Sequence, residues 1–362
     1  MATLTETAYK VRQGVKVGGI GFVAITLFWF LGNAGIAYYK ALNPPAPPPP
    51  TVDFGALQAI TFPDEKGRPQ LELELPTGTI QKFPDRMTVY FAPTKRSGFL
   101  DPQKAVETAA AMGFIFKPDQ PTETRYVWHK QDALSSSLDM DIVSGYFTLK
   151  RAWQNDPAVL VDSNFASDKQ VIADLGNFLS RVDLAPTDAF GNEKITYLKS
   201  EGEKLVPALS LSDSEFVRVD TFRSDIKIYD ESKGPDKKVE VGKYSFYRPD
   251  ADVGLIRAVM SGSRDTNNSV INMDYNYTKI EYDTNGTYPI KTGEQAWTEL
   301  KGGKGYVTNE GPKTGTVKIR RILLGYYDTD KNHKYMMPVY VFLGDKDFVA
   351  YVSAVADSYI LK

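Results

Sequence analysis

The stretch Val17–Tyr39, VGGIGFVAITLFWFLGNAGIAYY, decides the architecture of this 362-residue chain, because its 23 residues include no charge. As a helix it rises about 35 Å, which is enough to cross the apolar core of a bilayer. Lys10, Arg12 and Lys16 precede the stretch, while Lys40 alone follows it closely. The positive-inside rule therefore predicts a single-pass plasma-membrane protein with a cytoplasmic N-terminus and a C-terminal ectodomain outside.

The span sets the expected domain organisation of the whole chain. We expect a cytoplasmic tail at 1–16, a transmembrane helix in contact with lipid at 17–39, a proline-rich linker at 40–53, and two α+β lobes at 54–187 and 188–362. The boundary between the two lobes lies at the turn-forming sequence APTD, residues 185–188.

Two segments near the membrane have alternative interpretations. A cleaved signal peptide could use the small residues Gly32 and Ala34, but the apolar core of a signal peptide is usually only about 7–15 residues long. An uncleaved anchor is therefore favoured. Asn43–Thr51 holds six of the 22 prolines, which favours a semi-rigid polyproline II spacer. A proline-rich ligand for a partner's groove is the alternative.

Composition limits the chemistry of the ectodomain. There is no Cys, and His129 and His333 are the only histidines, which excludes disulfides, thiolate metal sites, a Cys nucleophile and a multi-histidine metal centre. We therefore expect no catalytic residue, cofactor or metal. Residues 41–362 carry a net charge of −5, which argues against binding to nucleic acid.

The ectodomain pattern predicts an α+β fold. Helix signals with caps and one apolar face occur at 101–113, 167–182 and 292–302, and Thr292 with Gln295 forms a capping box. Each helix is followed by strand-like runs, so we expect few short helices packed on long antiparallel sheets, with the unit repeated. The main expected strands are 70–75, 87–91, 125–129, 138–143, 145–149, 195–198, 216–222, 225–229, 243–247, 255–260, 270–282, 316–327, 335–343 and 348–355.

Polar motifs in the ectodomain favour turns over active sites. Asp328, Asp330 and Asn332 begin like a calcium loop but lack its glycine and its final glutamate, so a polar hairpin turn is expected. Asn285-Gly286 also predicts a tight turn.

Tyrosine is enriched, with 21 residues. Tyrosine supplies rigid amphipathic contact area and is favoured at protein interfaces. The alternative is that these rings pack helices onto the sheet with their hydroxyls at the rim. The candidate interface residues are Tyr288, Trp297, Tyr326, Tyr327, Tyr335 and Tyr340.

The C-terminal region, about residues 287–355, has a recognisable order. Thr287–Thr292 leads into a short helix with Trp297, a strand ends in Leu324–Tyr327, and Met337–Phe342 follows a turn. This order resembles PepSY-like extracytoplasmic domains, in particular the bitopic YycH/YycI-type regulators that restrain a cell-wall-sensing histidine kinase. The resemblance implies helices on antiparallel sheets, no catalytic residues, and binding or inhibition of partner proteins.

Two functions follow from the sequence. The first is a non-enzymatic, membrane-anchored protein that regulates or scaffolds a cell-envelope complex by binding an envelope or membrane protein. The alternative is an envelope hydrolase or ligand-binding enzyme that acts on wall polymer. It would use Asp139 and Asp141, which share one face of an expected strand, as a paired acid and base.

Overall fold

The computed structural model describes residues 4–42, 49–64, 67–131, 135–154, 159, 165–229, 240–263, 269–310, 315–329 and 333–361. The chain forms two compact units, Met1–Pro49 and Pro50–Lys362.

The first unit contains one long apolar helix, α1, at Leu4–Leu42. Within it Val11–Tyr39 has a mean hydropathy of 1.8 and none of it is buried, so its length and composition fit a membrane anchor or a signal sequence. The predicted N-terminal apolar helix is confirmed. Most of the predicted proline spacer, residues 43–48, lies outside the described residues.

The larger of the sheets in the second unit has eight antiparallel strands in the order β3-β4-β5-β12-β11-β8-β6-β7. Alternate side chains point to opposite faces, and the face that includes Val217 and Val219 of β8 carries the larger of the two apolar cores. The strands are β3 (Arg125–Gln131), β4 (Ser135–Asp141), β5 (Phe147–Arg151), β6 (Asn192–Glu201), β7 (Lys204–Pro207), β8 (Phe216–Phe222), β11 (Ile256–Ser261) and β12 (Val270–Tyr275).

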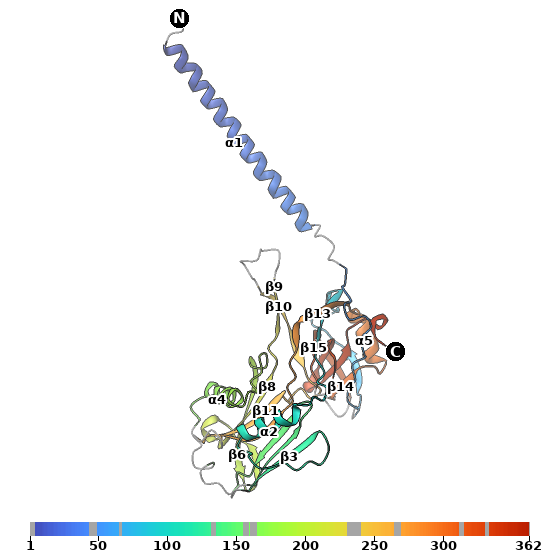
Figure 1. Cartoon of the computed structure of the whole chain (residues 1–362). Coiled ribbons are helices and arrows are strands. Elements are labelled where there is room, and N and C mark those ends of the chain that lie inside the picture. The colour runs from blue at the N-terminus through green and yellow to red at the C-terminus, as the bar shows by residue number, and fades with distance from the viewer. Residues whose placement is uncertain are drawn as a thin grey trace. The chain divides into compact units, whose positions relative to one another are not determined.

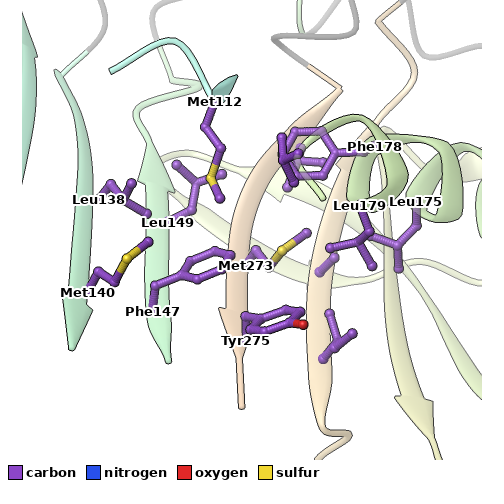
Figure 2. Packing of buried hydrophobic residues seen from close by; sticks show 14 of the residues in the cluster. Met112, Leu138, Met140, Phe147, Leu149, Leu175, Phe178, Leu179, Met273 and Tyr275 are labelled. Carbon is purple, nitrogen blue, oxygen red and sulfur yellow. The ribbon is translucent and has the colours of Figure 1, made fainter. Parts of the chain in front are cut away.

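Helices α2 (Asp101–Ala111) and α4 (Asp168–Arg181) cover this face. The Ser167 side chain accepts a hydrogen bond from the Gln170 amide and caps α4, as its sequence predicts. The sequence predicts Asp101 as the cap of this helix and Pro102 as its first residue, but α2 begins at Asp101 itself and Leu100 occupies the cap position. Figure 2 shows the apolar side chains of α4 and of strands β4, β5 and β12 pointing into one core.

The second sheet has seven strands in the order β14-β18-β17-β15-β10-β9, and β1 also pairs with β15. It is mixed, because β1 and β10 both run parallel to β15 and share one of its edges. The expectation of purely antiparallel sheets is therefore wrong here. The strands are β1 (Gln70–Leu73), β9 (Ile226–Tyr229), β10 (Glu240–Tyr247), β14 (Tyr306–Asn309), β15 (Thr316–Tyr327), β17 (Pro338–Gly344) and β18 (Val349–Ser353).

A third, small sheet has the order β13-β2-β16, with β2 at Arg86–Phe91, β13 at Glu281–Pro289 and β16 at Tyr335–Met336. Helix α5 (Gly293–Lys301) follows β13 and buries Ala296 and Leu300 against the core of the second sheet. The predicted capping box at its start is confirmed. Short 3-10 turns lie at Leu211–Asp213, Asp345–Asp347 and Asp357–Tyr359.

The chain crosses between the sheets several times. Strands β3 to β5 precede residue 187 and β6 to β8 follow it, yet all belong to the eight-stranded sheet. Likewise β1 pairs with β15, and β2 pairs with β13. The predicted lobes 54–187 and 188–362 therefore do not correspond to the sheets, because pairing between distant strands overrides proximity along the chain.

The predicted Asn285-Gly286 turn is wrong. Both residues lie inside β13, where the pairing with β2 shifts register between Glu281 and Asn285. A side chain at Gly286 would approach Asp53 to about 3.0–3.1 Å, so the glycine allows a close approach between two segments instead of a reversal of the chain.

Candidate functional site

The structure places most of the predicted interface tyrosines in the core. Tyr288, Tyr326, Tyr327 and Tyr340 are at most 3% exposed, whereas Tyr335 and Trp297 are half-buried. As they stand, these four rings cannot form the exposed aromatic patch that the sequence suggests.

Backbone carbonyls from distant parts of the chain accept the hydroxyl protons of three of these buried rings, Tyr288, Tyr326 and Tyr340. Tyr288 donates to the Gly55 carbonyl at 3.0 Å, and Tyr340 donates to the Lys291 carbonyl at 2.6 Å. A buried phenol without such a partner would be costly. The alternative interpretation of tyrosine as a packing residue is therefore correct for these positions, although the hydroxyls lie in the interior and not at a rim.

A hollow lined by Tyr326 together with three further tyrosines, Tyr90, Tyr229 and Tyr244, is the candidate site. It has a volume of about 390 Å³ and lies between the β9–β10 ribbon and strand β2. We call it the tyrosine groove. Its lining includes the cationic side chains of Arg86 and Lys227 and the apolar and aromatic residues Met87, Tyr90, Ile226, Ile228, Tyr229, Tyr244 and Tyr326.

The ribbon forms one wall because its sequence alternates. Ile226 and Ile228 are half-buried, while Lys227 between them is exposed. Ile226 pairs with Tyr244, and Ile228 pairs with Gly242, whose lack of a side chain leaves space beside the isoleucine. The apolar members of both strands therefore share one face.

Two ion pairs hold the ribbon together from its charged side. Lys227 lies 3.1 Å from Glu240, and Lys243 lies 2.6 Å from Asp225. Each pair raises the pKa of its lysine through a hydrogen bond to the carboxylate. The lysines therefore remain charged, and Lys227 contributes a cation to the lining of the groove beside the apolar residues.

The ribbon leaves the body of its sheet, and this opens the groove. Strand β10 pairs with β15 only from Ser245 to Tyr247, so the part of the ribbon before Ser245 extends beyond that pairing. Figure 1 shows β9 and β10 running out past the other strands of their sheet. Val241 on this ribbon is 61% exposed and Tyr229 is 41% exposed. β9 also ends the strand order and so presents an edge for pairing.

The floor of the groove is a contiguous aromatic cluster. The ring of Tyr326 lies 5.5 Å from Tyr90 and 6.2 Å from Tyr244, and Tyr90 lies 5.3 Å from Tyr282. Burial raises the pKa of Tyr90 and of Tyr244. Their hydroxyls therefore stay protonated at neutral pH and can donate hydrogen bonds.

Behind this cluster lies a buried charge network around Arg223. Its guanidinium donates to Asp328 at 2.9 Å, to Asp188 at 2.8 Å and to the Thr278 carbonyl at 2.6 Å. Tyr282 donates to the same Asp188 oxygen at 2.5 Å. The network thus connects the groove's aromatic cluster to the junction of the sheets, since Arg223 follows β8 and Asp328 follows β15.

The charges in this network compensate one another. Burial alone would lower the pKa of Arg223, but the electrostatic attraction of the Asp328 and Asp188 carboxylates is stronger and raises it. Burial and the hydrogen bond to Asp188 both raise the pKa of Tyr282. Arg223 is 2% exposed and Asp328 also 2%, so the network is a structural connection and not a solvent-accessible active site.

The two predicted candidate carboxylates have separate structural partners. Asp139 accepts two hydrogen bonds from Arg125 Nε, at 2.9 and 3.2 Å, and one from Nη2 at 2.5 Å. Asp141 accepts hydrogen bonds from the Ser144 amide at 2.7 Å and from its hydroxyl at 2.8 Å. The Arg125 bond lowers the pKa of Asp139, and for Asp141 hydrogen bonds outweigh burial with the same result.

The other predicted polar residues divide between the surface and the interior. His129 is exposed, 3.8 Å from Asp119. Asp328 of the expected polar hairpin turn directly follows β15 and is buried against Arg223. Asp330 and Asn332 lie outside the described residues.

Sequence reasoning missed the groove and the charge network. Alternation of Ile226 and Ile228 identified the strand but gave no sign that its apolar face lies beside β2. Nothing local marks Arg223, because its partners are at positions 188, 278 and 328.

Comparison with known proteins shows no matching family model, and no curated protein matches. Among solved structures, the chain is similar to an uncharacterized protein from Eubacterium rectale ATCC 33656, with 8% identity and a TM-score of 0.33. The match covers 75% of this chain and 84% of that one.

Proposed function

We propose that this chain is a membrane-anchored extracytoplasmic protein that binds an envelope protein through the tyrosine groove and thereby regulates or scaffolds an envelope complex. The observation that carries the proposal is the open apolar face of the β9–β10 ribbon opposite strand β2. Large aromatic rings with hydroxyl donors are the residue type that dominates protein interfaces.

The proposed occupant is an extended apolar segment of the partner. The groove has walls of β-structure, and β9 ends its sheet, so a peptide can pair with an edge while its side chains enter the hollow. Ile226, Ile228 and Met87 would contact apolar side chains, and the hydroxyls of Tyr90 and Tyr244 would donate to backbone carbonyls. The resemblance to PepSY-like and YycH/YycI-type regulators supports binding of this kind.

The same proposal assigns α1 as an uncleaved anchor with the N-terminus in the cytoplasm. Support comes from the length of its apolar stretch and from the basic residues Lys10, Arg12 and Lys16 before it. Intact-mass measurement on the protein isolated from native membranes tests the anchor. The mass of the uncleaved chain is expected, and a product that begins near Asn33 or Gly35 would contradict it.

Photo-crosslinking in native membranes tests the groove. A photoreactive phenylalanine is placed at Ile228 inside the groove or at Val241, which is exposed on the same ribbon. We expect one discrete protein adduct from position 228 and none from position 241. The adduct from 228 is expected to disappear when Tyr244 is also replaced by Ala, because that ring forms part of the groove.

Two results would count against the proposal. Equal labelling from positions 228 and 241 would mean that the ribbon meets other proteins without a preferred face. An adduct from 228 that persists unchanged after Tyr244→Ala would mean that the groove does not define the contact. Circular dichroism of the variants confirms that each remains folded.

A further inference from the structure

A second hollow lies beside α4, away from the tyrosine groove. Its volume is about 550 Å³, which is within the range of small-molecule sites. One wall is helix α4 and the other is the end of the β11–β12 hairpin. We call it the α4 cavity.

The helix contributes a row of polar side chains to this cavity. Gln170, Asp174, Asn177 and Arg181 are spaced by four, three and four residues, so they lie on one side of the helix. Gln170 Nε2 donates to Asp174 Oδ1 at 2.8 Å, which orients both groups before any ligand arrives. All four are exposed, so their polar atoms can reach a ligand.

The hairpin contributes hydroxyls to the opposite wall. The Ser261 amide donates to the Ser269 carbonyl at 2.8 Å and fixes the two strands beside each other. Ser263 also lines the cavity, and Gly262 between the serines adds no side chain that would narrow it. The wall therefore combines small hydroxyl groups with free volume.

The floor of the cavity is apolar and consists of core residues. Val171, Phe178 and Met260 line it and belong to the main core of the eight-stranded sheet. Figure 2 shows Phe178 within that core, beside α4. The guanidinium carbon of Arg181 lies 5.4 Å from the Phe178 ring centre, and this contact holds the arginine at the end of the row.

These features define the chemistry of a ligand. The row carries one carboxylate and one guanidinium, so its formal charges cancel and favour a neutral ligand. The lining offers neighbouring hydrogen-bond donors and acceptors from its amide, carboxylate, guanidinium and hydroxyl groups. Such pairs match the adjacent hydroxyls of a sugar ring, each of which can both donate and accept. The apolar floor matches the C–H face of such a ring.

We propose that the α4 cavity binds a neutral saccharide segment, with Asn177 and Asp174 on its hydroxyl pairs. The binding is independent of the tyrosine groove. The ligand's source is either a free oligosaccharide or a glycan strand of the envelope, since both present the same hydroxyl chemistry.

Calorimetric titration of the full-length chain in lipid nanodiscs tests the proposal, because maltoside detergents would themselves offer sugar head groups. The probes are four neutral tetramers, namely β-1,4-linked N-acetylglucosamine, cellotetraose, maltotetraose and mannotetraose, and one cationic tetramer, chitosan tetraose. At least one neutral tetramer is expected to bind. Asn177→Leu is expected to weaken that binding at least tenfold, and Ser180→Leu on the same helix is expected to leave it unchanged.

Absence of binding by all four neutral tetramers would overturn the proposal, as would unchanged affinity in Asn177→Leu or a preference for the cationic tetramer. Both substituted positions are exposed, and thermal melting checks that the variants fold. Sedimentation with purified wall glycan distinguishes the sources. Co-sedimentation that Asn177→Leu abolishes assigns the polymer, whereas tetramer binding without sedimentation assigns free oligosaccharide.

Discussion

The two large sheets of Pro50–Lys362 differ in how much tyrosine contributes to their cores. The eight-stranded sheet is covered by α2 and α4, and its core consists mainly of aliphatic, methionine and phenylalanine side chains. The core of the seven-stranded sheet and its small neighbour is also mainly aliphatic, but it includes buried tyrosines, four of which donate their hydroxyls to backbone carbonyls of distant segments. The spacing of apolar residues along the sequence predicts which helix face is buried. Whether a tyrosine is buried depends on a distant carbonyl that can accept its hydroxyl proton, and the local sequence does not reveal that carbonyl.

Substitution of Arg223, at the junction between the two large sheets, should give the largest loss of unfolding free energy. Arg223→Met leaves the buried Asp328 and the half-buried Asp188 without their counter-charge, which costs about 3–5 kcal/mol of unfolding free energy. Urea denaturation measures the loss. The control is Arg125→Met, which breaks the exposed pair with Asp139 and should have a far smaller effect. Equal losses in both variants would mean that the junction does not depend on its charge network.

Substitution of a core residue of α4, which covers the eight-stranded sheet, should give the next largest loss of unfolding free energy. Leu175 on α4 is fully buried, so Leu175→Ala removes packed methyl groups and leaves a cavity at a cost of about 2–5 kcal/mol. The half-buried neighbour Ile172, replaced by Ala, serves as the control and should lose less. A Leu175→Ala protein as stable as wild type would contradict the assignment of α4 as a core helix.

Removal of a single tyrosine hydroxyl from the core of the seven-stranded sheet should reduce the unfolding free energy by a smaller amount. Tyr340→Phe keeps the ring but removes the donor to the Lys291 carbonyl, with an expected cost of about 1 kcal/mol. Chemical denaturation again provides the measurement. No change, or a gain in stability, would show that the hydroxyl bond is not part of what holds this region together.

Alkaline pH should produce the smallest and most specific difference. The folded-state pKa of Tyr282 is raised by burial and by its bond to Asp188, while an unfolded tyrosine titrates near about 10. Stability is intact below that pH and falls above it, because the unfolded state loses its proton first. Tyr282→Phe should therefore lose stability less steeply between pH 9 and 11 in urea titrations. A slope identical to that of wild type would contradict this role.

Local signals account for much of the fold. Ser167 and the Thr292–Gln295 capping box placed two helices correctly, and β8 and β15 occupy the residues that their patterns predict. Strand β13 was missed in part because Asn285-Gly286 resembles a turn when read without Asp53 beside it.

The candidate site was much less predictable than the fold. Tyrosine enrichment correctly drew attention to aromatic contacts, but exposure depends on whether a carbonyl such as that of Gly55 or Thr88 lies within reach of the hydroxyl. The groove itself arises where β10 leaves β15 after a short pairing, which is a property of tertiary structure alone.

The central claim is that the open face of the β9–β10 ribbon holds a partner. The most direct test is the size of the full-length protein's complex in solubilised native membranes, measured for wild type, Ile228→Asp and Val241→Asp. Ile228 lines the groove, whereas Val241 is exposed on the same ribbon. We predict a complex larger than the free chain for wild type and Val241→Asp, and only the free chain for Ile228→Asp. An unchanged complex in a folded Ile228→Asp variant would contradict the claim.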